Sequence, residues 1–213
     1  MGITRETAFR GHALEVSQEL KKSAFGVHFL VIYPDLSTLR EMYSYYVKSA
    51  LSDDGNGIVL VLPFLETVDN VRRILSENSA NIDIRKYEKE QSLLIMDSLK
   101  GYFGLQNGLM PFVEQTVEYA KKSGKSGLSV LADMGSFFYN DKKNDLLQYE
   151  MALPSKYKNM NLKGFCVYHK LDFDRGLTEK ERQILLEHHG KTLILLPSQI
   201  VINPYFKWIS RVS

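Results

Sequence analysis

The sequence predicts an α/β fold in which helices cover both faces of a mainly parallel central sheet. Short apolar runs rich in β-branched residues alternate with longer amphipathic segments along most of the 213 residues, which is typical of parallel strands joined by helical crossovers. The runs are almost continuously hydrophobic, as strands covered on both faces are. Hydrophobic residues make up 44% of the chain and charged residues 24%, which excludes disordered and fibrous classes.

Each element follows from its own local pattern. The apolar runs predict strands at Val27–Tyr33, Gly57–Leu62, Ser92–Met96, Leu128–Ala132, Gly164–His169 and Thr192–Leu196. The amphipathic segments predict helices at Leu36–Leu51, Thr67–Asn78, Leu109–Lys122, Asn144–Leu153 and Thr178–His188. The segment Ile82–Tyr87 fits either state. We expect Asp35 or Ser37 to cap the first of these helices, and Thr178 with Glu181 to cap the last.

A further helix is expected before the first strand. Phe9, Ala13, Val16 and Leu20 recur at helical spacing and form one apolar stripe. We expect this helix to cover the sheet or its edge. The alternative is that it docks a partner protein or a second copy of the chain, which would make a homodimer.

The C-terminal residues form a separate piece. A short apolar run after Gln199 predicts an extra strand, and the aromatic residues Tyr205, Phe206 and Trp208 follow it. The expected organisation is therefore an N-terminal amphipathic helix over 1–24, one sheet domain over 25–197 and a C-terminal extension over 198–213.

Charge and cysteine content exclude several classes of function. The chain has 27 basic and 25 acidic residues, a net charge of +2, so we do not expect direct nucleic-acid binding. The single cysteine, Cys166, allows neither an intrachain disulfide nor an all-cysteine metal site. The polar N-terminus lacks the apolar core of a secretory signal, and no apolar run approaches the roughly 18 residues of a membrane span. We expect a cytoplasmic protein.

The loop after the first strand lacks the residues that bind phosphate. Ligands of open parallel sheets bind at the carboxyl ends of the strands, and nucleotide-binding chains place a glycine-rich turn with a lysine there. Here the segment from Tyr33 to Arg40 has neither, and Asp35 would repel a phosphate. Gly124-Lys125-Ser126 lies between a helix and a strand, the reverse of the P-loop order, and predicts a helix-ending turn. Asp133 ends a strand as a Walker B acid would, although without a phosphate cradle beside it.

Motifs for other chemistry are absent as well. The sequence has no G-x-S-x-G elbow and no H-E-x-x-H helix. His188 and His189 lie about 100° apart on their helix, and Cys166 and His169 project from opposite faces of one strand. The sequence therefore predicts no metal site and no cofactor, and it predicts that Cys166 is a buried, unreactive thiol.

Four segments together resemble the MEDS domain, a sensory module of methanogens, methylotrophs and the dichloromethane-metabolism repressor. They are His28 to Tyr33, Leu128 to Gly135 with Asp133-Met134, Leu146 to Glu150, and Gly164 to Tyr168. Their order and spacing carry the resemblance, which covers roughly residues 24 to 197. It implies a RecA/KaiC-like three-layer sandwich that has lost its P-loop and senses hydrocarbon derivatives. The chain departs from the family in having Asp133 where Glu is common, and in showing no fused output domain.

The candidate ligand site combines strand-end residues with residues of these motifs. Tyr33, Asp133, Tyr168 and His169 lie at or near the carboxyl ends of predicted strands. We therefore expect them to converge on one crevice, with Met134 as an apolar wall. His28 matches the family's histidine and lies on the opposite face of its strand from Tyr33, about 16 Å away. We expect either a buried structural role or a ligand-binding role for it.

Glu150 and Cys166 complete this candidate set because they lie in the family's motifs. We expect Glu150 to be a solvated surface acid; the alternative is that it pairs with His28 or with a lysine. The strand position of Cys166 keeps the expectation of a buried thiol.

The function predicted from these residues is non-catalytic sensing of a small, partly apolar ligand, with the signal passed to a kinase or regulator protein. The first alternative is a divergent ATPase that uses Asp133 and a cradle without glycine. The second is an adaptor that binds proteins without any small ligand. The sequence names neither the ligand nor the partner.

Overall fold

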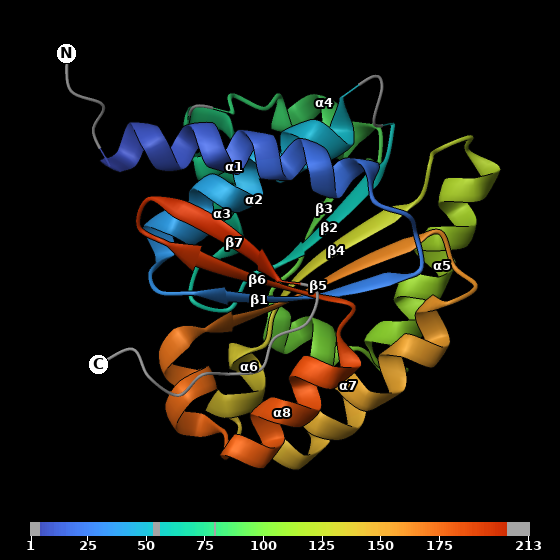
Figure 1. The fold of residues 1–213 in the computed structure, drawn as a ribbon. Helices are drawn as coiled ribbons and strands as arrows, with labels where there is room; N and C mark the ends of the chain where they lie inside the picture. The colour runs from blue at the N-terminus through green and yellow to red at the C-terminus, as the bar shows by residue number, and fades with distance from the viewer. Residues whose placement is uncertain (1–4, 53–55, 79, 204–213) are drawn as a thin grey trace.

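The computed structural model describes residues 5–52, 56–78 and 80–203 and has three layers, with a central sheet between two layers of helices (Figure 1). The strands are β1 (Val27–Tyr33), β2 (Ile58–Leu62), β3 (Leu93–Ile95), β4 (Leu128–Asp133), β5 (Leu162–His169), β6 (Lys191–Leu196) and β7 (Gln199–Asn203). They lie in the order β3-β2-β4-β5-β1-β6-β7, and only the pairing of β6 with β7 is antiparallel. The mainly parallel α/β fold is confirmed.

The helices differ from the expected ones in a few places. They are α1 (Arg5–Lys22), α2 (Leu36–Leu51), α3 (Val68–Glu77), α4 (Ile84–Lys89), α5 (Leu109–Lys122), α6 (Gly135–Tyr139), α7 (Lys143–Tyr157) and α8 (Glu179–His188), with π-helical turns η1 (Lys100–Gly104) and η2 (Asp172–Gly176). The ambiguous Ile82–Tyr87 segment becomes helix α4. The short elements α6, η1 and η2 were not predicted, because five residues are too few to show a helical period.

Helix termini follow the sequence signals. Asp35 rather than Ser37 caps α2, since its side chain accepts a hydrogen bond from the Thr38 amide. Thr178 and Glu181 form the expected capping box at α8. Gly124 follows α5 with a φ of 71°, the left-handed conformation that ends a helix.

The sheet separates two hydrophobic cores. One core contains side chains of α1, α2, α3 and α4 with Phe29, Val31 and Tyr33 of β1. The other contains side chains of α5, α6, α7 and α8 with Leu30 and Ile32 of the same strand. The alternation of β1 therefore places His28 and Tyr33 on opposite faces, as expected.

The N-terminal helix α1 packs within the chain. Its stripe of Phe9, Ala13, Val16 and Leu20 is at most 4% exposed and belongs to the core of the α1–α4 face. Figure 1 shows α1 lying across this face, beside α2 and β7. The Lys163 ammonium of β5 donates to the carbonyl oxygens of Leu20 and Lys21, so a cation satisfies the C-terminal end of this helix.

The C-terminal extension begins with the expected strand, β7. The aromatic residues Tyr205, Phe206 and Trp208 lie outside the described residues. No helix among the described residues has both the length and the hydrophobicity needed to cross a membrane.

Candidate functional site

A small apolar recess opens at the carboxyl edge of the sheet, on the α1–α4 face. The cavity itself is about 30 Å³, and the empty space around it, open solvent included, is about 390 Å³. Leu36, Leu39, Val61, Val71, Leu131 and Val167 form most of its apolar lining, and Tyr43, Glu66 and Asp133 contribute the polar groups. Leu65, at the recess, is half exposed. The loops after β1, β2 and β4 thus bound a pocket where open parallel sheets bind ligands.

Glu66 is a buried carboxylate in this recess, and several donors surround it. Its Oε1 accepts from Arg40 Nη2 at 2.7 Å and from Asn70 Nδ2 at 2.7 Å. Its Oε2 accepts from the Tyr43 hydroxyl at 3.3 Å. Charge and hydrogen bonds therefore balance the burial of this acid.

Asp133 ends β4 beside Tyr33, the last residue of β1. The Tyr33 hydroxyl donates to Asp133 Oδ2 at 3.1 Å, and the amide of Gly135 donates to Oδ1 at 2.9 Å. Burial is the main cause that raises the pKa of Asp133 to about 7, and the neighbouring carboxylates of Asp172 and Glu66 raise it as well. The two hydrogen bonds lower this pKa, but they oppose the rise only in part. The recess therefore contains an acid that is half protonated near neutral pH.

A carboxylate caps the helix that follows β1, where a nucleotide-binding chain would place a phosphate. Asp35 Oδ1 accepts from the Thr38 amide at 3.0 Å and from the Ser37 hydroxyl at 2.6 Å. The N-terminal amides of a helix are the groups that hold a phosphate. In this chain the protein's own anion already uses them.

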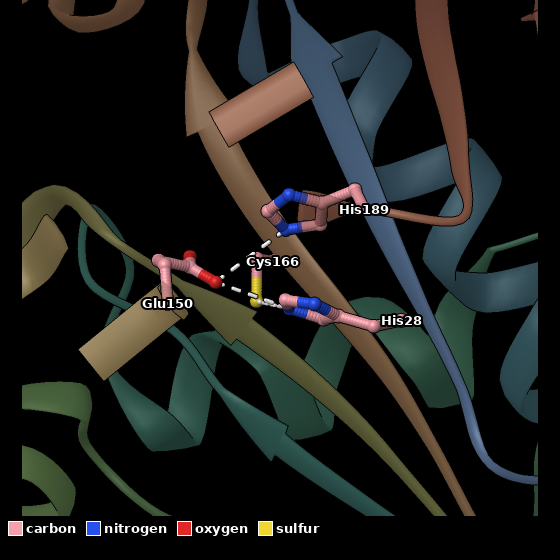
Figure 2. A group of neighbouring side chains, drawn as sticks. All are labelled: His28, Glu150, Cys166 and His189. Atoms are coloured by element: carbon pink, nitrogen blue, oxygen red, sulfur yellow. Dashed lines mark hydrogen bonds and ion pairs between the residues drawn. The ribbon is translucent and has the colours of Figure 1, made fainter. Parts of the chain in front are cut away.

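A second polar group lies on the opposite face of the sheet, between β1, β5 and helices α7 and α8 (Figure 2). It consists of His28, Glu150, Cys166 and His189, which we call the buried quartet. All four are buried, and one ligand atom of each lies within 4.8 Å of the others. His28 Nε2 is 3.0 Å from Cys166 Sγ and 3.1 Å from Glu150 Oε2.

The two histidines of the buried quartet stack on each other, with ring centroids 3.8 Å apart. His189 Nε2 lies 3.4 Å from Glu150 Oε2, and the Tyr168 hydroxyl donates to Glu150 Oε1 at 2.6 Å. Burial would raise the pKa of Glu150, but charge and hydrogen bonding from His189 and His28 hold it well below its usual range. Burial and the charge of His189 lower the pKa of His28.

A tyrosine ring packs on the buried quartet. The Tyr157 ring meets His28 edge to face, with centroids 5.4 Å apart. Gly164 of β5 makes room for it, since a Cβ there would lie 2.4 Å from the Tyr157 ring. Burial and the charge of Glu150 raise the pKa of the Cys166 thiol well above its usual value, so this buried thiol is neutral when no metal ion is bound.

The structure divides the predicted site residues between these two places. Tyr33, Asp133 and His169 lie together on the recess face, where the Tyr33 and His169 rings are 5.2 Å apart. Tyr168 points to the other face, to Glu150, and Met134 packs there against the Tyr102 hydroxyl. The predicted single crevice was wrong for Tyr168 and Met134, because neighbouring residues of a strand project to opposite faces.

Glu150 corrects a second expectation. It is 0% exposed and pairs with His28, so the predicted solvated surface acid is wrong and the alternative pairing holds. His28 and Cys166 join it on the same face.

Sequence reasoning missed Glu66 and His189. Glu66 follows β2 at the carboxyl edge, a position that could have marked it. His189 was not predicted because it and His188, about 100° apart on a helix, cannot both point at one metal ion. His189, directly after α8, lies instead 3.4 Å from Glu150 of α7.

Comparison with known proteins agrees with this architecture. Residues 27–183 match the family described as the MEthanogen/methylotroph, DcmR Sensory domain, MEDS. The KaiC-like protein PH0186 of Pyrococcus horikoshii OT3 is similar in structure, with a TM-score of 0.54 and 15% identity over 84% of this chain and 90% of that one.

A second solved structure gives the same fold. The uncharacterised protein PH0321 of Pyrococcus horikoshii, solved in complex with an unknown peptide, has a TM-score of 0.55 and 15% identity over 84% of this chain and 81% of that one. At this identity the likeness shows the RecA/KaiC-like fold alone. No curated protein matches the sequence. Because the family match spans most of the sheet and both polar groups except His189, the chain belongs to the MEDS family of sensory domains.

Proposed function

We propose that this protein is a non-catalytic sensor that binds a small, mainly apolar molecule in the recess at the carboxyl edge of the sheet. The observation that carries the proposal is the apolar pocket itself, with Asp133 and Glu66 as its polar groups. Small-molecule sites are usually concave and mostly apolar, with few polar groups to orient the ligand. Membership of a sensory family supports the same reading.

The chemistry of the recess defines the class of ligand. Six aliphatic side chains would contact a short hydrocarbon group, and the Asp133 carboxyl, half protonated near neutral pH, could donate to or accept from a hydroxyl or carbonyl of the ligand. A triphosphate suits the site poorly, since Glu66 and Asp133 would repel it and Asp35 already caps α2. Signalling would then pass through a kinase or regulator protein that recognises the changed edge of the sheet.

Methyl NMR with straight-chain alcohols from methanol to hexanol tests this proposal. We expect saturable shifts at the methyl groups of Leu39, Val61 and Leu131, which line the recess, and none at Leu30, Leu60 and Val130 on the opposite face. Val61→Phe should abolish the shifts by filling the recess. Shifts that spread over both faces, or that survive Val61→Phe, would contradict the proposal.

A divergent ATPase is the second candidate, and the KaiC-like fold is the observation compatible with it. Calorimetric titration with ATP and Mg²⁺ separates the two. Micromolar, magnesium-dependent binding would favour the ATPase, and the sensor proposal predicts no heat of binding.

A further inference from the structure

The buried quartet has an incomplete set of hydrogen bonds. His189 Nδ1 lies 2.6 Å from the carbonyl oxygen of Leu185. A carbonyl oxygen can only accept, so this nitrogen carries the hydrogen, and whenever the ring is neutral the lone pair of Nε2 points toward Glu150. Glu150 Oε2, 3.4 Å away, is also an acceptor. Both atoms are buried and neither makes a hydrogen bond, although His28 Nε2 lies 3.1 Å from the same carboxylate oxygen.

Two buried acceptors that face each other need a cation or a proton between them. Leaving such groups unsatisfied costs free energy, and a proton on His189 would satisfy only this pair. His28 Nε2 and Cys166 Sγ, which are 3.0 Å apart, belong to the same group of four atoms. A single metal ion would satisfy all four atoms at once.

The distances suit a tetrahedral ion. Zinc bonds of about 2.0–2.3 Å to nitrogen, oxygen and sulfur place neighbouring ligand atoms roughly 3.3–3.8 Å apart. The four donor atoms of the buried quartet lie within 4.8 Å of one another, with closest pairs at 3.0 and 3.1 Å. Small side-chain shifts would therefore bring them to coordination distance.

We propose that His28, Glu150, Cys166 and His189 bind one divalent first-row transition-metal ion, with Zn²⁺ as the ion that fits the donors best. Imidazole and thiolate ligands favour zinc over magnesium or calcium, which take oxygen ligands. One thiolate and one carboxylate would neutralise the two positive charges, as a buried site requires.

Neighbouring groups already orient these ligands. The Leu185 carbonyl fixes the tautomer of His189, and the Tyr168 hydroxyl holds the carboxylate of Glu150. Partners of this kind accompany metal-bound histidines and carboxylates in most proteins. With four protein ligands the site would be closed, which is typical of structural zinc. The ion would join β1, β5, α7 and the residue after α8, so it would stabilise the fold and take no part in the ligand binding proposed for the recess.

Production of the full chain without a histidine tag in Co²⁺-supplemented medium tests the site without requiring metal to enter a closed core. We expect close to one Co²⁺ per chain by elemental analysis, a thiolate-to-cobalt charge-transfer band and the visible bands of tetrahedral Co²⁺. Zinc-supplemented cells should yield one Zn²⁺ per chain by native mass spectrometry. Substoichiometric metal and no thiolate band in the wild type would overturn the proposal.

Two matched variants show whether the named residues bind the ion. His189→Gln should lose the metal, while His188→Gln should keep it, because the His188 ring bonds to the Ile184 carbonyl and lies outside the buried quartet. Equal metal content in both variants would overturn the four-ligand site. Should His189→Gln not fold, Tyr168→Phe gives the same answer, with metal affinity expected to fall about 10–100-fold and the thiolate band retained; wild-type affinity in Tyr168→Phe would count against the proposal.

Discussion

The two faces of the sheet solve the burial of polar groups in different ways. On the recess face, Glu66 accepts from Arg40, Asn70 and Tyr43, and Asp133 accepts from Tyr33 and Gly135. On the opposite face, Glu150 is buried together with two histidines and a thiol. Three polar atoms of this buried quartet have no hydrogen-bond partner. The recess face is hydrogen-bonded and open at its edge, whereas the other is closed and leaves these polar atoms without partners. An open pocket suits a ligand that comes and goes, and a closed cluster suits a permanent ion.

The largest expected effect on stability is the loss of the buried carboxylate Glu150, compared with the loss of Glu66. Glu150→Ala should lower the free energy of unfolding by about 3–5 kcal/mol, because it leaves buried histidines and the Tyr168 hydroxyl unpaired. Glu66→Ala should cost less, about 1–3 kcal/mol, since the partly exposed Arg40 can be solvated. Urea denaturation of both variants measures the difference. Equal losses would show that the two faces do not differ as their contacts indicate.

On the recess face, Asp133 should make the stability of the protein depend on pH. The pKa of Asp133 is about 7 in the fold, against 3.8 for an ordinary aspartate. The fold favours the neutral form of Asp133. The contribution of this group to the free energy of unfolding is therefore complete below about pH 4 and is lost as the pH rises through 7. A rise of about three pKa units at about 1.4 kcal/mol each makes the loss on the order of 4 kcal/mol.

Asp133→Asn is neutral at every pH and serves as the reference for this effect. Denaturation between about pH 4 and pH 9 should show the wild type losing stability relative to the variant as the pH rises. Parallel profiles would mean that Asp133 is ionised throughout, which would remove the half-protonated acid from the proposed ligand site.

The sequence predicted the elements better than the site, for a physical reason. Continuous apolar runs locate parallel strands, and β1 was predicted to its last residue. Pleat alternation placed His28 and Tyr33 on opposite faces, and the same rule, applied to Tyr168 and His169, would have separated these two as well. The grouping of Glu150 with His189 depends on how α7 and α8 pack, and no local pattern encodes that contact.

A steric probe tests how tightly the closed face is packed. Gly164→Ala would place a Cβ 2.4 Å from the Tyr157 ring that packs on His28. We expect a cost of about 1–3 kcal/mol, as for other overpacked cores. Gly11→Ala is the control, because nothing lies within 4 Å of its Cβ in α1, and it should stabilise the protein by about 0.5–1 kcal/mol. Thermal denaturation measures both, and a neutral Gly164→Ala would show that the aromatic shell is loose.

The smallest effect concerns the helix cap at the recess edge. Asp35→Ser keeps a side chain that can accept from the Thr38 amide, so stability should change by less than about 1 kcal/mol. The substitution removes the anion that would oppose a phosphate, yet Pro34 still lacks an amide hydrogen and no glycine turn replaces it. We therefore expect no binding of ATP with Mg²⁺ to either form by calorimetry. Binding that appears only in Asp35→Ser would mean that one carboxylate separates this recess from a nucleotide site, and that the two faces differ by less than their present contacts indicate.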